Sequence, residues 1–321
     1  VSVDLTGFWR PRLKGWLGKH YHSLTGKALP AVVFGVIIIS GQAQGKRLPL
    51  LRRIIRCQPD QSESDYQAEV LRQVALLDQP GDVKVLDAGF KVSELAEAGL
   101  QGFVLRMQSN CTARRNSLPA YKGRGARPKY GERVRPLARK HKEKLIPATK
   151  PDHRAEFKHE DRTIKVSFWQ NLVPSDTKVA DATHCFSLYV FFDPHYTKPL
   201  ILATDLDLRP ETVFLIYVDR WPVEQPPLAA KQMIGLHRQF VFALEACFRL
   251  PELALLAGAI LSYVAAFSPP VPTGFWDRKP QATPGRLRRL LAKVEIPNMT
   301  QFDPQVRKKA SVTGHLPKGI D

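Results

Sequence analysis

Cysteine is scarce in this chain, and its spacing excludes two kinds of chemistry. Only four of the 321 residues are cysteines. No two of them form the C-x-x-C pair that is typical of structural zinc sites and of dithiol redox proteins. We therefore expect reduced cytosolic thiols at all four positions, which are Cys57, Cys111, Cys185 and Cys247.

The sequence also lacks a secretory signal and an apolar run long enough to span a membrane. Residues 1–5 alternate like a strand, and Arg10, Arg12 and Lys14 follow at once, which is not the pattern of a signal peptide. The longest apolar run, 253–267, has fifteen residues, whereas a transmembrane helix needs about twenty. We expect a buried helix there, a cytoplasmic protein and no membrane partner.

Acidic residues are outnumbered by basic ones. The chain has 30 Asp and Glu against 48 Lys and Arg, a formal net charge of +18, which favours nucleic acid as a partner over an anionic membrane surface. Most of the excess lies in residues 106–165, with 18 basic and 6 acidic side chains. Residues 118–150 mix glycine and proline with arginine and lysine, which is typical of an extended basic loop.

The first third of the chain predicts an α/β layer. Apolar residues make up 44% of the sequence, enough for one large domain or two smaller ones. The β-branched run at 32–40 is typical of a strand buried on both faces, and Ser64 with Gln67 forms a capping-box pattern ahead of an amphipathic helix. Strands and helices then alternate around one sheet. The other elements expected here are strands at 1–5, 83–86 and 103–107 and a helix at 93–98.

Strands resume after the basic loop and lead into helices. We expect strands at 163–169, 186–192 and 200–204, and a helix that begins at Pro210, where proline is well tolerated. A second helix is expected at about 228–249, and the apolar helix follows Pro251. From Ser268 onward the sequence is rich in Pro, Lys and Arg and reads as a tail, and there are no internal repeats.

Four residues form the pattern Y-x2-R-x3-E-x6-K: Tyr217, Arg220, Glu224 and Lys231. On a helix that turns about 100° per residue they lie at roughly 0°, 300°, 340° and 320°, which puts them on one face. The bland alternative is an exposed face with one salt bridge. Three prolines, at positions 222, 226 and 227, surround the glutamate, so we expect a kink that makes the direction of Lys231 the least certain.

Two aspartates at the ends of predicted strands complete a set of carboxylates. Asp4 lies in the first strand, and Asp87 follows the strand at 83–86. Taken singly, each is more simply explained as part of a turn. Together with Glu224 they form a set of oxygen ligands that could bind a pair of divalent cations such as Mg²⁺ beside a phosphate substrate.

The three sites together resemble the DDE transposases of bacterial insertion sequences, in the group marked by this same four-residue signature. The matching segments are Val-Ser-Val-Asp-Leu-Thr around Asp4, Val-Leu-Asp-Ala-Gly-Phe around Asp87, and Tyr-Val-Asp-Arg-Trp-Pro-Val-Glu through Lys231. The resemblance covers residues 1–265. It implies a ribonuclease H-like α/β fold, a mixed sheet flanked by helices with a β-rich basic insertion before the glutamate-bearing helix. The implied parts are core 1–107, insertion 108–208, core 209–267 and tail 268–321.

The resemblance also implies a mechanism and partners. Asp4, Asp87 and Glu224 would bind two Mg²⁺ ions, for which Mn²⁺ can substitute, and would support DNA cleavage and then strand transfer at transposon ends. Tyr217, Arg220 and Lys231 would hold the terminal phosphates. Trp169 would stack on an extruded base, although a core tryptophan is the commoner role of such a residue. The partners would be double-stranded DNA and a second copy in a homodimeric, nucleoid-associated complex.

Two alternatives stay open. One is a ribonuclease H-like nuclease that cuts structured DNA without strand transfer. The other is a non-catalytic, DNA-binding remnant of a transposase. Members of the group carry a region for end recognition ahead of the first aspartate, and Asp4 is the fourth residue here. We therefore expect this chain to hold the catalytic chemistry without the end specificity.

Overall fold

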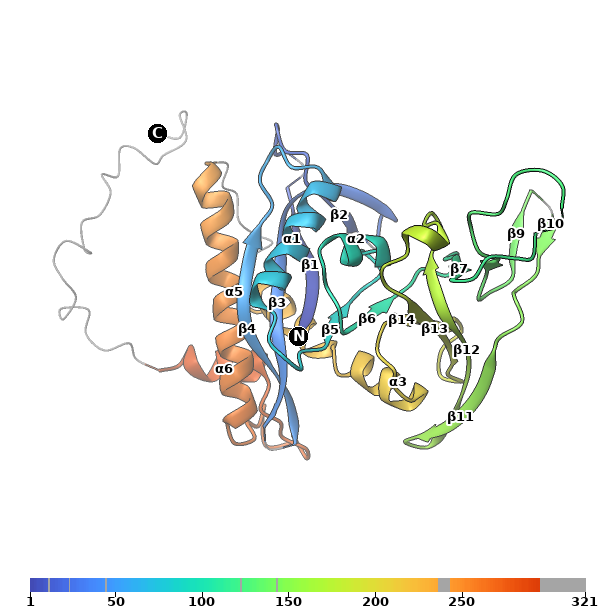
Figure 1. Ribbon diagram of the computed structural model, residues 1–321. Coiled ribbons are helices and arrows are strands. Elements are labelled where there is room, and N and C mark those ends of the chain that lie inside the picture. The colour runs from blue at the N-terminus through green and yellow to red at the C-terminus, as the bar shows by residue number, and fades with distance from the viewer. Residues whose placement is uncertain are drawn as a thin grey trace.

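The computed structural model describes residues 1–294 apart from 11, 23, 44, 122, 143 and 236–242. The chain has an α/β fold built on one large mixed sheet (Figure 1). Its strand order is β2-β3-β1-β5-β6-β14-β13-β12-β7-β8, with β4 paired to β3 and β11 paired to β12. The strands are β1 Ser2–Trp9, β2 Lys19–His22, β3 Lys27–Ala43, β4 Lys46–Arg56, β5 Lys84–Leu86, β6 Phe103–Arg106, β7 Ala113–Arg115, β8 Arg133–Val134, β11 His153–His159, β12 Arg162–Pro174, β13 Phe186–Phe192 and β14 Leu200–Thr204; β9 Arg139–His141 and β10 Lys144–Ile146 form a separate pair.

Strand β3 is buried on both faces, as its apolar run predicts. Val33 and Ile37 pack in one core cluster with α1, and Phe34 and Ile38 pack in a second cluster with α5. Alternate side chains of a strand point to opposite faces, so one continuous apolar run serves both layers. The helices are α1 Glu63–Leu77, α2 Val92–Glu97, α3 Pro210–Val218, α4 Gln225–Gln232, α5 Leu244–Phe267 and α6 Pro284–Leu291, with short 3₁₀ helices η1 Val179–Asp181 and η2 Trp221–Glu224.

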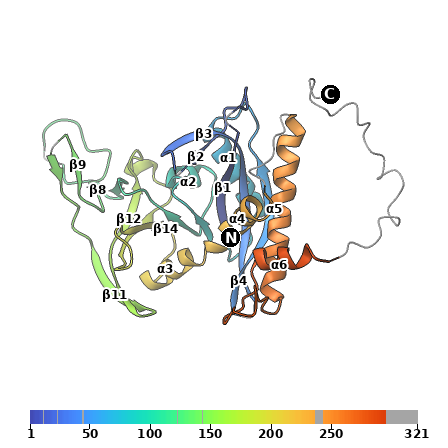
Figure 2. The same ribbon diagram turned by 180° about the vertical axis from the view of Figure 1, so that it is seen from behind.

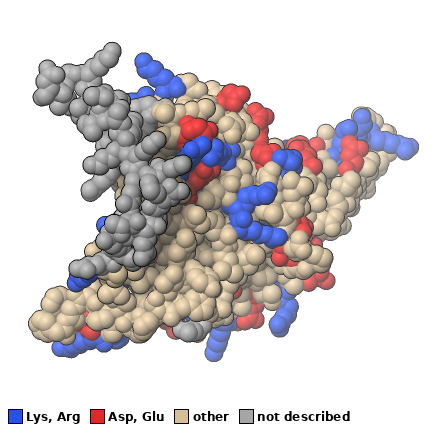
Figure 3. Space-filling model, turned by 90° about the vertical axis from the view of Figure 1, so that its left-hand side faces the viewer, with Lys and Arg blue, Asp and Glu red and all other residues tan. Residues whose placement is uncertain are grey.

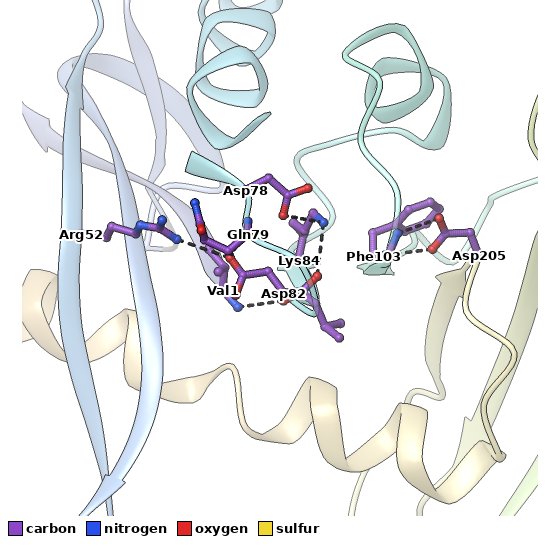
Figure 4. A network of polar contacts seen from close by, with 10 residues as sticks. Val1, Arg52, Asp78, Gln79, Asp82, Lys84, Phe103 and Asp205 are labelled. Carbon is purple, nitrogen blue, oxygen red and sulfur yellow. Dashed lines mark hydrogen bonds and ion pairs between the residues drawn. The ribbon is translucent and has the colours of Figure 1, made fainter. Parts of the chain in front are cut away.

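The strands of the expected insertion extend the same sheet. Strand β14 pairs antiparallel with β6, with Leu202 opposite Arg106 and Thr204 opposite Val104. Asp205 follows β14 and accepts hydrogen bonds from the backbone amides of Gly102 and Phe103, at 2.8 and 2.9 Å (Figure 4). Hydrogen bonds between backbone groups and a side chain therefore join residues 200–205 to the first part of the chain. The expected strands at 186–192 and 200–204 are confirmed as β13 and β14.

A polar network lies where β5 begins. The Lys84 side chain is buried and pairs with Asp78 at 2.8 Å, and Arg52 reaches Asp82 at 3.4 Å (Figure 4). A buried ammonium needs such a partner because its desolvation is costly. Asp87 follows the other end of β5, so this network holds the sheet together at the end away from the candidate site.

The region after residue 225 differs from the expectation of a helix at 228–249. Helix α4 ends at Gln232, and Gly235 has a φ of 75°, a left-handed conformation that glycine tolerates best. Residues 236–242 lie outside the described part of the chain. Helix α5 begins at Leu244, earlier than expected, and runs through Pro251. The predicted tail contains α6, and its residues 295–321 also lie outside the described part.

Helix α5 is long and apolar enough to cross a membrane by length and composition, although the sequence run had appeared too short. It has 24 residues, and 44% of its most apolar window is buried within the protein. The buried side packs on β4, β3 and α4. The opposite side exposes an apolar row, and Figure 3 looks onto this side of the molecule, where uncharged surface forms a broad area. The row consists of Leu253, Leu256, Ile260, Tyr263 and Phe267.

Candidate active site

Strand register brings the two aspartates side by side. Strands β1 and β5 are parallel neighbours, with Val3 opposite Leu86. Asp4 comes directly after Val3 and Asp87 directly after Leu86. The two aspartates therefore lie side by side at the same level of the sheet. Asp4 is partly buried within β1, while Asp87 follows the carboxyl end of β5. The alternative that each aspartate merely serves a turn does not account for Asp4, which lies inside a strand.

Glu224 reaches the site from a 3₁₀ helix. Proline cannot donate a backbone hydrogen bond, but the first turn of a helix requires none. Pro222 lies in the first turn of η2, and Pro226 and Pro227 lie in the first turn of α4, so all three are accommodated where the chain restarts. The expectation of one helical face is therefore wrong, since the four signature residues are distributed over α3, its junction with η2, η2 itself and α4.

Arg220 holds this part of the site together. The residue is 7% exposed, and its guanidinium donates to Glu224 Oε1 at 2.7 Å and lies over the Tyr217 ring, 5.4 Å from the centroid. Its Nη1 atom is buried without a hydrogen-bond partner among the described residues. Burial alone lowers the pKa of Arg220, but the phenol of Tyr217 and the nearby carboxylates raise it above its ordinary value. The guanidinium thus stays positively charged, and its Nη1 has N–H donors that no described residue uses.

Tyr217 and Arg106 both face Asp87. The Tyr217 hydroxyl lies 3.5 Å from Asp87 Oδ1, and Arg106 Nη1 lies 3.4 Å from the same oxygen. Asp87 Oδ1 also accepts the backbone N–H of Ala88 at 2.8 Å. Burial, and then the charge of Asp87, raise the pKa of Tyr217, which keeps the phenol a donor. Arg106 was missed as a site residue, although its place at the end of the strand after Asp87 was a usable signal.

Asp4 is the most perturbed carboxyl group of the site. Its pKa is raised to about 7: burial is the largest cause, Arg220 opposes it, and the charges of Asp87 and Glu224 add to the increase. Like charges near one another disfavour ionisation, and so does removal from water. The three carboxylates therefore interact electrostatically, and Asp4 gains most from any added positive charge.

Lys231 approaches the same group from α4. Its ammonium lies over the rings of Phe8 and Trp9, at 5.2 and 5.5 Å from their centroids. Burial lowers the pKa of Lys231 to about 8, and the nearby charge of Asp4 partly opposes this. The restart of the helix at Gln225 thus brings Lys231 back toward Asp4, although its direction was the least certain from the sequence.

Trp169 is not available for base stacking. It is 1% exposed in the core and donates its Nε1–H to the carbonyl of Lys150 at 2.9 Å. Its position on β12 points the ring into the cluster that also holds Leu172 and Leu188. The expected contact with an extruded base is therefore wrong, and the commoner role as a core tryptophan applies.

The donor set fits a hard divalent cation by its chemistry. Asp4, Asp87 and Glu224 offer carboxylate oxygens, which Mg²⁺ and Mn²⁺ prefer, and the raised pKa of Asp4 marks a carboxyl group without enough compensating charge. In the described part of the chain, however, no three His, Cys, Asp or Glu side chains lie at metal-binding separation. Glu224 is bonded to Arg220 instead, so chelation requires the glutamate to turn toward the aspartates.

No protein-family model matches the chain, and no curated protein matches it.

Proposed function

We propose that this chain is the catalytic core of a DNA transposase with a ribonuclease H-like fold, which cleaves DNA and transfers strands at transposon ends. The observation that carries the proposal is the convergence of Asp4, Asp87 and Glu224 around the buried cation of Arg220. The strand order supports it: β4, β3 and β1 are antiparallel neighbours, and β1, β5 and β6 are parallel neighbours, which is the order expected of a ribonuclease H-like core.

Each residue has a role in phosphoryl transfer. Asp4, Asp87 and Glu224 would hold two Mg²⁺ ions, which when bound supply an activated oxygen nucleophile and stabilise the leaving oxygen. Arg220 offers its unused Nη1 donor to a phosphate oxygen, and the fork geometry of guanidinium suits that anion. Tyr217 donates its hydroxyl from beside Asp87. Lys231 supplies a point charge on the Asp4 side.

A cleavage and joining assay tests this proposal. The substrate is a plasmid that carries the DNA flanking the gene, incubated with the full chain and Mg²⁺ or Mn²⁺. We expect nicked and joined products from the wild type and a loss of at least about 100-fold in Asp87→Ala, because one metal ligand is removed. Asp161→Ala is the matched control, since that carboxylate is 80% exposed and lies in the turn between β11 and β12.

The products separate the alternatives. Nicking without joining would identify a nuclease that lacks strand transfer. Equal products from wild type and Asp87→Ala would refute the catalytic assignment. DNA binding with no cleavage by any variant would identify a non-catalytic remnant.

A further inference from the structure

A groove outside the carboxylate site lies between four parts of the chain. It has a volume of about 770 Å³ and is lined by the start of β4, the η2–α4 segment, the last turns of α5 and the start of α6. Figure 2 shows α6 beside the lower end of α5, with α4 nearby. Its floor is apolar and includes Ala229, Met233, Ala265 and Ala266. The groove is therefore a recess with an apolar floor.

The rim of this groove is cationic. Five basic side chains line it, and no Asp or Glu of the described residues does; the five are Lys46, Arg47, Arg286, Arg288 and Arg289. Two of them are neutralised from outside the groove, since Arg47 pairs with Asp219 at 2.8 Å and Arg286 with Asp277 at 2.7 Å. Arg288 and Arg289 are exposed and make no ion pair with a described carboxylate. The rim therefore has positive charge available for an anion.

An aromatic side chain links the groove to the carboxylate site. Trp221 is 50% exposed and lines the groove, and it lies on the same short helix as Glu224. Gln225, the residue after Glu224, also lines the groove. The 3₁₀ helix η2 thus places Glu224 in the carboxylate site and Trp221 in the groove. A DNA strand bound at the carboxylate site could therefore continue into the groove.

We infer that the groove binds unpaired nucleotides of a DNA strand that extends from the carboxylate site; the identity of the strand rests on the proposed function. Unpaired bases can lie on an apolar floor and against an aromatic ring while successive phosphates meet cations at the rim. A duplex presents phosphates alone and leaves the floor unused. A single anionic lipid headgroup would leave most of the cationic rim without a partner.

Binding of a labelled twelve-nucleotide oligothymidine, measured by fluorescence anisotropy in EDTA, tests the inference without any catalytic step. We compare Arg288→Gln/Arg289→Gln with Arg72→Gln/Arg249→Gln, which removes the same charge from exposed positions elsewhere on the surface. We expect the groove variant to lose about 10-fold in affinity and the salt slope to fall by about 1.4, for two phosphates released. Binding of a blunt duplex should change less than about 2-fold. Circular dichroism melting checks that both variants fold.

Other results would overturn the inference. An equal loss of single-strand and duplex binding would assign the arginines to duplex phosphates. Unchanged oligothymidine binding with lost binding to phosphatidylserine vesicles would assign the groove to a membrane surface. The plasmid assay separates this inference from the proposed function. If the wild type cleaves DNA but the groove variant binds oligothymidine with unchanged affinity, only the inference about the groove is refuted. If the groove variant selectively loses oligothymidine affinity but the wild type does not cleave DNA, only the proposed transposase function is refuted.

Discussion

At the scale of single residues, Asp4 shows how burial poises a carboxyl group for a cation. Burial, Asp87 and Glu224 hold its pKa near 7, so a proton occupies the site under mildly acidic conditions. Under the proposed function a divalent cation would have to displace that proton, so metal affinity would rise with pH. Arg220 partly offsets the repulsion but is committed to Glu224. The ionised Asp4 carboxylate is therefore costly in the folded protein, and a proton or, under the proposed function, a metal ion would relieve that cost.

Replacing Asp4 by Asn should stabilise the protein at high pH. The folded pKa lies above the ordinary value of 3.8, so the wild type loses stability as pH rises from about 4 to 7 and bears the full cost above 7. We expect Asp4→Asn to be more stable by up to about 4 kcal/mol at pH 8, since each pKa unit corresponds to about 1.4 kcal/mol, with the difference vanishing toward pH 4. Urea unfolding in EDTA at several pH values measures this.

Addition of Mg²⁺ at pH 8 should raise the unfolding midpoint of the wild type and not that of Asp4→Asn, since a ligand stabilises only the state that binds it. Asp161→Asn, at an exposed position, should behave like the wild type throughout. A variant less stable than the wild type at pH 8 would contradict the assigned cost of Asp4.

At the scale of elements, the break between α3 and α4 lets residues 221–232 contribute two side chains to the site from two different helices. Prolines that would disrupt a continuous helix instead begin η2 and α4, so Glu224 and Lys231 approach the aspartates from different helices. Helix α4 is held against α5 at a close approach. A Cβ on Gly258 would lie 2.6 Å from the carbonyl oxygen of Pro226 and 3.1 Å from the amide nitrogen of Ala230.

Gly258→Ala should destabilise the protein although alanine favours helices. The added methyl group meets backbone atoms of α4 that cannot turn away, so we expect a net loss of about 1–3 kcal/mol instead of the gain of about 1 kcal/mol from helix propensity. DNA cleavage should fall with it because α4 carries Lys231. Chemical denaturation and the plasmid assay measure the two effects.

Gly285→Ala in α6 is the matched control, since a methyl group there meets only the flexible side chain of Met233. We expect that variant to be at least as stable as the wild type. Equal stabilisation by both changes would show that the contact between α4 and α5 is loose.

At the scale of the whole molecule, charge is concentrated in the segment that extends the sheet. The formal net charge is +18, and residues 106–165 hold 18 basic side chains against 6 acidic ones. Much of this segment is exposed, and before β11 its strands are short, among them β8, β9 and β10. Phosphate attraction of this kind needs no base contact, and it weakens as salt concentration rises because the release of DNA counterions then contributes less free energy.

Duplex binding should therefore depend steeply on salt through this segment. We expect Arg124→Gln/Arg127→Gln, at exposed loop positions, to reduce the slope of log affinity against log salt concentration by about 1.8, for two phosphate contacts. The Arg72→Gln/Arg249→Gln pair serves again as the control of equal charge. Anisotropy titrations across a range of salt concentrations give the slopes, and identical slopes for the two pairs would place the duplex elsewhere on the surface.

Local patterns predicted much of the secondary structure and failed where signals conflicted. The apolar run of β3, the helix α1 and the proline start of α3 were all expected. The cap of α1 is Ser62 and not Ser64, since the Ser62 hydroxyl accepts the backbone N–H of Asp65. Strand β4 was not expected, since its arginines interrupt the apolar alternation. A helix across 228–249 failed at Gly235, where the backbone turns left-handed.

The sequence by itself determined the number and kinds of chemical groups available: three carboxylates near the ends or starts of elements, the tyrosine, arginine and lysine that accompany Glu224, and a surplus of positive charge. Those depend on residue type and short spacing alone. Only the tertiary structure decided that Asp4 lies beside Asp87, that Trp169 is buried and that Arg106 joins the site. Strand register, burial and the resulting pKa of Asp4 arise from contacts between residues far apart in the chain, so no local pattern contains them.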